Sequence, residues 1–322
     1  MMQSVFFIKI VYMAHFIMHK NTYETFLQAQ GPQGSLQGIL LSPYPNPKNV
    51  ILIIPGSGPT DRDGNNPLGV NASTYRLLAE NMALNDIATL RVDKRGMFAS
   101  SAAVTDTNAV TINDYVEDVR SWITVLKQHL ESPCIWLLGH SEGGIVALAA
   151  AEERDVYGLI VVATPSSPLG EVLRYQFKAN QENAILLDDA LFVINELEHN
   201  RRTNVQNMHP ALQRIFHPAV QGFLMDIFSF NPSHLIARIT KPVLILQGQR
   251  VLQVTENDAR KLKSANPKST LVLLPDVNHV LKEVHSADRC ENNSAYTNAS
   301  LPLAPGVVDA ITEFMTHNAL RH

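Results

Sequence analysis

The sequence predicts an α/β fold in which a mostly parallel central sheet is covered by helices on both faces. Two observations support this prediction. Short apolar runs alternate along the chain with amphipathic segments, and such alternation specifies parallel strands joined by crossover helices. The central runs, such as Val50–Pro55, are apolar throughout rather than at every second residue, as is typical of strands that are buried on both faces.

The predicted elements begin with a hairpin, because two strand-like runs flank the turn-forming residues Gly31-Pro32-Gln33-Gly34. The predicted strands are Thr22–Gln30, Ser35–Ser42, Val50–Pro55, Ile87–Val92, Cys134–Leu138, Leu159–Ala163, Val243–Gln247 and Thr270–Leu274. The predicted helices of the same unit are Ser73–Leu84, Thr111–Leu130, Gly143–Glu153, Asn257–Ser264 and a closing helix that includes Val307 to Met315. Thr111–Leu130 shows the clearest helical pattern, with apolar residues at spacings of three and four.

One stretch interrupts this alternation. Leu169 to Ile239 has no convincing strand and contains two helical patterns, Ala184–Glu198 and Pro218–Phe230. Because the stretch lies between two core strands, we expect an insertion over one edge of the sheet. The predicted organisation is a core made of residues 22–168 and 240–322, with a helical cap at 169–239.

The first 21 residues, 1–21, are predicted to be an extension outside the fold. Their apolar run is interrupted by Lys9 and His15, and no small-residue cleavage site follows, which disfavours both a secretory signal and a stable membrane span. A start of translation at Met13 or Met18 would explain the extension. A cytoplasmic location is therefore expected, with export as the alternative.

Composition narrows the function classes. The 322 residues are 45% hydrophobic and 17% charged, as in ordinary globular proteins. A net charge of -4 without a basic stripe disfavours a nucleic-acid partner and favours a small molecule. Cys134 and Cys290 are too few for a disulfide framework, which favours reduced thiols, with one bridge as the alternative. Histidines such as His209 and His217 lack ligand spacing, so no metal site is predicted.

The residues Gly139-His140-Ser141-Glu142-Gly143 point to nucleophilic catalysis. They follow a predicted strand and precede a predicted helix, and so abrupt a turn crowds its central residue unless glycines flank it. Ser141 is then held in a strained conformation with its hydroxyl exposed above the sheet. The helix N-terminus favours a developing oxyanion. A tight turn without catalytic use is the alternative interpretation.

A serine nucleophile needs a base and an oxyanion hole. Among twelve histidines, His279 is the one that lies just after the last predicted core strand, where this architecture carries its base; a surface histidine is the alternative. His140 reads as a structural flank of the turn. Backbone N–H groups of Glu142, after the nucleophile, and of Ser57, in Gly56-Ser57-Gly58-Pro59, are the predicted oxyanion donors. An ordinary glycine turn is the alternative for the second.

The chain resembles bacterial α/β-hydrolases of the serine aminopeptidase-like carboxylesterase group, roughly from Tyr23 to His317. The motifs that carry the resemblance are Gly56-Ser57-Gly58-Pro59-Thr60-Asp61-Arg62-Asp63-Gly64-Asn65, Asp93-Lys94-Arg95-Gly96, Gly139-His140-Ser141-Glu142-Gly143 and Asn278-His279-Val280-Leu281-Lys282. The resemblance implies an α/β-hydrolase fold, ester or amide hydrolysis through an acyl-enzyme without a cofactor, and a helical cap over the site. Asp61-Arg62-Asp63 either lines the entrance or braces its loop, and bracing is favoured for Asp93-Lys94-Arg95.

The chain departs from that group at the acid of the catalytic triad. The group carries a Gly-x-x-Asp pattern after the strand that corresponds to Val243–Gln247, whereas this chain has Gly248-Gln249-Arg250-Val251. Val251 therefore stands where the acid is expected. Glu256, Asp258 and Asp276 are nearby carboxylates, but the first two are better placed to cap the next helix.

The sequence thus predicts a serine hydrolase that cleaves small carboxylic esters, weakened by the missing acid. In serine proteases, loss of the orienting acid lowers kcat by about 10⁴-fold. An aminopeptidase-like amidase and a non-catalytic ligand-binding protein that has lost its triad are the two alternatives.

Overall fold

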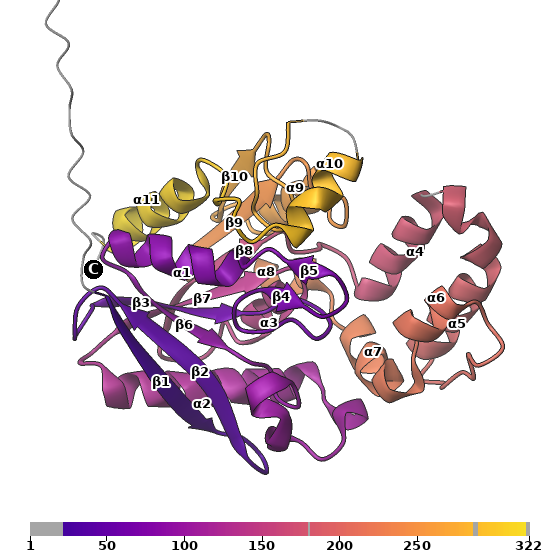
Figure 1. The fold of residues 1–322 in the computed structure, drawn as a ribbon, viewed down its shortest axis with the longest axis horizontal. Coiled ribbons are helices and arrows are strands. Elements are labelled where there is room, and N and C mark those ends of the chain that lie inside the picture. The colour runs from indigo at the N-terminus through magenta and orange to yellow at the C-terminus, as the bar shows by residue number, and fades with distance from the viewer. Residues whose placement is uncertain (1–21, 180, 286–288, 320–322) are drawn as a thin grey trace, which may run out of the picture.

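The computed structural model describes residues 22–179, 181–285 and 289–319, so the predicted extension 1–21 lies outside the described residues. Its centre is an eight-stranded sheet with the order β1-β2-β6-β3-β7-β8-β9-β10. The hairpin at one edge is antiparallel, and the strands from β6 to β10 are parallel. This sheet, with helices on both faces, is the α/β-hydrolase fold that the sequence predicts (Figure 1).

The strand bounds agree closely with the predicted ones. The strands of the main sheet are β1 Tyr23–Gln30, β2 Ser35–Ser42, β3 Asn49–Ile54, β6 Ala88–Val92, β7 Cys134–His140, β8 Val156–Val162, β9 Val243–Gly248 and β10 Thr270–Leu274. The sequence patterns did not reveal a short second pairing, β4 Asn65–Asn66 with β5 Val70–Asn71. The main helices of the core are α1 Thr74–Leu84, α2 Ile112–His129, α3 Glu142–Ala149, α9 Glu256–Ala265, α10 Arg289–Ser294 and α11 Val307–Ala319.

Two hydrophobic cores lie on opposite faces of the sheet. Alternate side chains of a strand point to opposite faces, so β3 serves both cores: Leu52 packs on the side of α2 and α3, and Ile53 on the side of α1 and α11. Burial on both faces explains why β3 reads as a continuous apolar run. The capping box of Thr111 and Asp114 fixes the start of α2.

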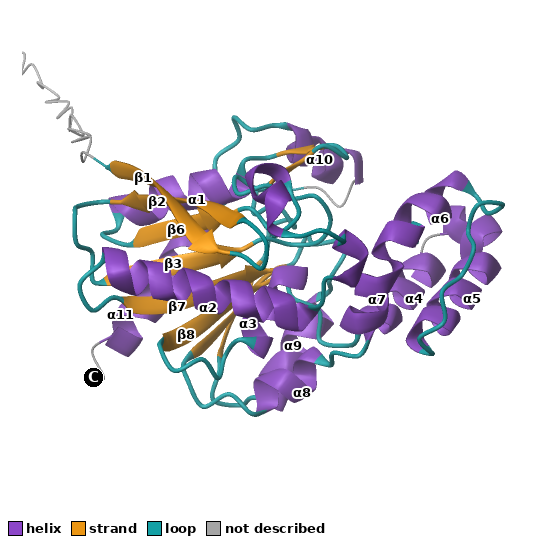
Figure 2. Cartoon of the chain, turned by 90° about the horizontal axis from the view of Figure 1, so that it is seen from below, coloured by secondary structure: helices purple, strands orange, loops and turns teal. Residues whose placement is uncertain are grey.

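Between β8 and β9 the described residues form helices joined by loops, and they include no strand. They form α4 Leu169–Ala179, α5 Leu187–Glu198, α6 Pro210–Ile215, α7 Gln221–Phe228 and α8 Pro232–Ala237, joined in part by short 3-10 turns. Helices α4 to α7 gather beside the sheet at one end of the molecule, whereas α8 packs on the core against α9 (Figures 1 and 2).

Three hydrogen bonds fasten helices α4 and α7 of this insertion to the core. The side chain of Asp226 on α7 accepts a hydrogen bond from the N–H of Ile112 at 2.7 Å, and the N–H of Gly222 donates to the Asn108 side chain at 2.7 Å. On α4, the Gln176 side chain donates to the carbonyl oxygen of Gln253 at 2.8 Å. The insertion is therefore attached both near the start of α2 and to the loop that follows β9.

Candidate active site

Ser141 occupies a strained turn between β7 and α3. Its backbone has φ 56° and ψ -120°, a conformation that side chains rarely adopt. A Cβ atom on Gly143 would lie 2.3 Å from the carbonyl oxygen of Ile54, and one on Gly139 would lie 2.3 Å from that of Gly143. The flanking glycines thus allow the turn to pack against the end of β3.

Ser141 and His279 line the same cavity, although 138 positions separate them in the chain. The cavity has a volume of about 220 Å³, and Gly56 and Ser57 also border it. Its other polar lining residues are Thr60, Asn66, Thr74, Tyr75, His140, Gln253 and Tyr296. The structure therefore brings the predicted site residues Ser57, Ser141 and His279 together around one cavity, and Glu142 follows directly after Ser141.

The turn that carries His279 is held by the buried side chain of Asn278. Its oxygen accepts hydrogen bonds from the N–H groups of Val280 at 3.2 Å and Lys282 at 3.0 Å. The hydroxyl of Thr74, at the start of α1, donates to the carbonyl oxygen of Val280 at 3.0 Å. These bonds fix the backbone on both sides of His279, so the ring projects from a rigid turn.

His140 connects the nucleophile turn to the His279 turn. Its Nε2 lies 2.9 Å from the carbonyl oxygen of His279, and its Nδ1 lies 2.8 Å from the Tyr75 hydroxyl. A carbonyl oxygen only accepts, so Nε2 carries the proton and Nδ1 accepts from Tyr75. The Tyr75 oxygen in turn accepts from the N–H of Gly56 at 3.0 Å. Burial lowers the pKa of His140 to about 4, which keeps this ring neutral.

The described residues place no carboxylate behind the ring of His279. Its Nδ1 is buried and has no hydrogen-bond partner among the residues that the structure describes. Burial, with a smaller contribution from neighbouring His140, holds the pKa of His279 well below 6.5. Val251 packs in the same apolar cluster as Val277 and Leu281, which flank His279 at a distance of two residues on either side. An apolar side chain thus fills the region where the sequence leads us to look for the acid.

The three alternative carboxylates have other partners. Asp276 accepts from the Arg250 guanidinium at 3.1 Å. Glu256 pairs with Gln249 and Arg260. Asp258 accepts from the N–H and hydroxyl of Thr255, as the helix cap that the sequence predicts, and its second oxygen accepts from Ser166. None of these contacts involves the His279 ring, so none of the three carboxylates replaces the acid in this arrangement.

The predicted oxyanion loop, Gly56-Ser57-Gly58-Pro59, is held by two hydrogen bonds. Ser57 is exposed to the cavity, and its carbonyl oxygen accepts from the Thr60 hydroxyl at 2.9 Å. The preceding residue, Gly56, is buried, and its carbonyl oxygen accepts from the Lys94 ammonium at 2.7 Å. Sequence patterns did not single out this role of Lys94, because the two residues lie 38 positions apart.

The charged motif Asp61-Arg62-Asp63 braces its loop. Arg62 forms an ion pair with Asp93, and Asp63 forms one with Arg91 on β6. The carbonyl oxygen of Asp63 also accepts from the N–H of Tyr75 at 3.0 Å, at the start of α1. Of the two roles that the sequence leaves open for this motif, these contacts favour bracing over lining the entrance.

Within the described ranges, no helix combines the length and the apolar composition that a bilayer crossing requires. This finding concerns the helices alone.

Comparison with known proteins places the chain in a family. A sequence profile described as "Alpha/beta hydrolase family" matches residues 50–289. The esterase EstD of Thermotoga maritima is 26% identical over 253 residues, which make up 78% of this chain and 56% of EstD. The chain therefore spans little more than half the length of this relative.

Solved structures show the same fold. The α/β hydrolase GrgF from Penicillium superposes with a TM-score of 0.58 at 20% identity, covering 93% of this chain and 99% of GrgF. Est1E from Butyrivibrio proteoclasticus superposes with a TM-score of 0.56 at 15% identity, covering 92% of this chain and 99% of Est1E. At these identities the likeness concerns the fold alone.

Proposed function

Because the chain belongs to the alpha/beta hydrolase family, we propose that it is a serine hydrolase that cleaves small carboxylic esters through an acyl-enzyme. The observation that carries this proposal is the strained Ser141 turn, which faces a cavity that also holds His279. The similarity to the esterase EstD points to the same chemistry. The low number of cysteines supports a cytoplasmic location as part of the proposal.

The proposed reaction has two steps. In the first, the Ser141 hydroxyl attacks the ester carbonyl carbon while His279 takes its proton, and the N–H groups of Ser57 and Glu142 bind the oxyanion. The carbon–oxygen bond to the alcohol then breaks, and the imidazolium returns the proton to the departing alkoxide. In the second step, His279 deprotonates a water molecule that attacks the acyl-serine. The carboxylic acid leaves, and Ser141 regains its proton.

The size of the cavity favours small substrates. Its volume of about 220 Å³ is below the roughly 300–1,000 Å³ of pockets that hold drug-sized ligands. A long acyl chain would have to extend toward the helical insertion, which we propose acts as a cap.

Activity is expected to be modest, because no acid among the described residues pairs with the His279 Nδ1. Such an acid fixes the tautomer and stabilises the imidazolium that forms during attack. A Ser141–His279 dyad is sufficient for activated esters but poor for amides, whose leaving amine requires a firmly held proton donor. This argument ranks the ester hydrolase above an aminopeptidase-like amidase.

The lack of a described partner for the His279 Nδ1 also supports a second candidate function, a ligand-binding protein without catalysis. A fluorophosphonate probe distinguishes the two, because it reacts covalently only with an activated serine. We expect the full-length protein to gain one adduct by intact mass, mapped to Ser141 by peptide sequencing, and Ser141→Ala to gain none. A panel of p-nitrophenyl esters from acetate to dodecanoate should then show highest kcat/KM for the short chains. A folded protein that the probe does not label, and that does not hydrolyse p-nitrophenyl acetate, would support the ligand-binding protein instead.

A further inference from the structure

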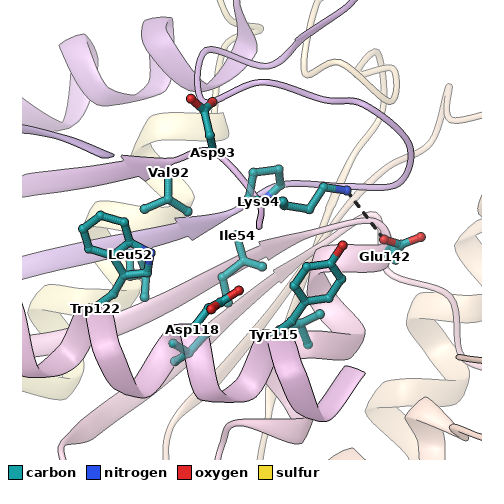
Figure 3. Close-up of a pocket in the computed structure, with 12 residues that line it drawn as sticks. Leu52, Ile54, Val92, Asp93, Lys94, Tyr115, Asp118, Trp122 and Glu142 are labelled. Carbon is teal, nitrogen blue, oxygen red and sulfur yellow. Dashed lines mark ion pairs between the residues drawn. The ribbon is translucent and has the colours of Figure 1, made fainter. Parts of the chain in front are cut away.

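A buried cation lies directly beneath the proposed oxyanion hole. The Lys94 ammonium, on the loop after β6, donates to the Gly56 carbonyl oxygen at 2.7 Å and lies 3.8 Å from a carboxylate oxygen of Glu142. The ring of Tyr115 on α2 has its centre 6.0 Å from the same nitrogen. Figure 3 shows a second pocket, lined by Lys94, Tyr115 and Glu142 and distinct from the cavity of Ser141, in which the Lys94 side chain extends toward Glu142 with Tyr115 below it. Only 6% of the Lys94 side chain and 7% of the Glu142 side chain are exposed.

The two contacts of Lys94 correspond to the two halves of the hole. The carbonyl group of Gly56 and the N–H of Ser57 belong to one planar trans peptide, so they point in opposite directions. A cation that holds the carbonyl on the core side therefore turns the Ser57 N–H toward the cavity. The other half, the N–H of Glu142, belongs to the residue whose carboxylate faces the same cation.

The N–H group of Gly56 is also held by a hydrogen bond. Its own N–H donates to the Tyr75 oxygen at 3.0 Å, and Tyr75 donates to His140. Between Lys94 and Tyr75, both polar groups of Gly56 are occupied. The peptide that follows it therefore has little freedom to rotate, and its N–H is held in place before substrate arrives.

We propose that Lys94 and Glu142 are a positioning pair that aligns and strengthens the two N–H donors of the oxyanion hole. This inference rests on the proposed hydrolase function. The cation also polarises the Gly56–Ser57 peptide, since a hydrogen bond to a carbonyl makes the N–H of the same unit a better donor. Glu142 balances the charge, so the pair adds no net positive charge to the buried site.

Burial opposes each charge when it stands alone. It lowers the pKa of Lys94 and raises that of Glu142, and the attraction between the two charges offsets part of both shifts. A variant that removes one partner would leave the other charge buried and unpaired, which destabilises the fold for reasons unrelated to catalysis. The test therefore removes both charges together, in Lys94→Met/Glu142→Gln, which keeps the backbone N–H of residue 142.

The neighbouring residue offers a matched control. Arg95 is also buried, and it pairs with Asp118 at 2.8 Å and Asp114 at 2.8 Å on α2, without contacting the oxyanion loop. Arg95→Met/Asp118→Asn removes a buried pair from the same loop. If buried pairs serve stability alone, the two double variants should behave alike.

The measurements are kcat and KM on p-nitrophenyl acetate, the inhibition constant of phenylboronic acid, and the labelling rate with the fluorophosphonate probe. Removing one oxyanion donor outright costs roughly 10²–10³ in kcat, so misaligning the donors should cost about 10- to 100-fold. We expect that loss for Lys94→Met/Glu142→Gln, with KM nearly unchanged and phenylboronic acid, which forms a tetrahedral serine adduct, weakened by a similar factor. Arg95→Met/Asp118→Asn should keep the kcat of the parent, at a lower melting temperature.

Several outcomes would overturn the inference. A folded Lys94→Met/Glu142→Gln protein with the parent's kcat and labelling rate would do so while leaving the hydrolase proposal intact, whereas a parent that the probe never labels would remove both. If the double variant does not fold, Lys94→Ala prepared in the presence of propylammonium decides, because the bound amine pairs with the Glu142 carboxylate that the variant would otherwise leave buried and unpaired. Propylammonium replaces the atoms removed from that side chain, so it should restore much of the lost kcat. An unchanged kcat, or a loss that propylammonium does not reverse, would contradict the role of Lys94.

Discussion

The ring of His140 and the backbone of His279 are joined by a hydrogen bond of 2.9 Å, and the centres of their two rings lie 4.6 Å apart. His140 thus precedes the proposed nucleophile, Ser141, in the sequence, and its ring supports the backbone of the proposed base, His279. The neutral state of His140 matters here, because only its Nε2–H can donate to the carbonyl while its Nδ1 accepts from Tyr75.

The first prediction concerns this link. His140→Phe keeps a ring in the buried site but leaves the Tyr75 O–H without an acceptor and the His279 carbonyl without a donor. Each unsatisfied buried group costs about 1–3 kcal/mol of stability. We expect kcat on p-nitrophenyl acetate to fall about 10- to 100-fold, because small displacements of a catalytic group are expensive. The exposed His129 supplies the control, since His129→Phe should retain the parent's kcat. A fully active His140→Phe protein would show that the link has no role in catalysis.

Stability should depend on pH through the same two rings. In the folded protein the pKa of His140 is about 4 and that of His279 is well below 6.5, the value that both regain on unfolding. Below pH 6.5 the unfolded chain therefore binds protons that the folded chain does not. The contribution of the two rings to the free energy of unfolding is therefore complete above pH 6.5. It decreases as the pH falls toward 4, by up to about 1.4 kcal/mol per pH unit for each ring.

Guanidinium denaturation near pH 7 and near pH 5 would measure this loss. His140→Phe removes one of the two titrating groups, so its stability should decline less steeply than that of the parent. Equal stability of the parent at the two pH values would contradict the burial that lowers both pKa values.

Val251→Asp should raise the kcat of ester hydrolysis. A carboxylate at this position would accept the His279 Nδ1–H and stabilise the imidazolium, so kcat is expected to rise by two to four orders of magnitude, below the roughly 10⁴ ceiling of the serine-protease cases. The acid limb of the kcat/KM profile should also move to higher pH, because a nearby negative charge raises the pKa of His279. Stability should fall, since a carboxylate enters an apolar cluster.

Val254→Asp is the matched control for that experiment, because Val254 is buried in the same loop and cluster. It should lose stability without gaining activity. A folded Val251→Asp protein with no gain, beside a fast parent, would mean that another carboxylate already assists His279. Neutralising Asp276, Glu256 and Asp258 one at a time would then find it.

The last prediction tests whether Ser141 and His279 act as one unit. Ser141→Ala and His279→Ala should each reduce ester hydrolysis to a similar residual level, and the double variant should be little worse than either, because members of a catalytic unit are strongly non-additive. Steady-state rates on p-nitrophenyl acetate give the comparison. Losses that simply multiply would place His279 outside the reaction.

The sequence predicts the strands well because parallel strands buried on both faces leave continuous apolar runs, as β3 does. Ends of elements are less certain: β7 continues to His140, and α3 ends at Ala149 rather than at Glu153. The Ser141 turn and the position of His279 follow from local patterns. The links from His140 to His279 and from Lys94 to Gly56 do not, since they join residues 139 and 38 positions apart through contacts that only the folded chain creates.

The backbone of Ser141 also has a consequence for how this protein changes over generations. Its φ of 56° and ψ of -120° suit glycine, and such conformations cost other residues about 1–3 kcal/mol. A single exchange of Ser141 for glycine would release that energy at once, in a protein whose whole stability is about 5–15 kcal/mol. A lineage that no longer needed the hydroxyl would therefore gain a sturdier protein by discarding it.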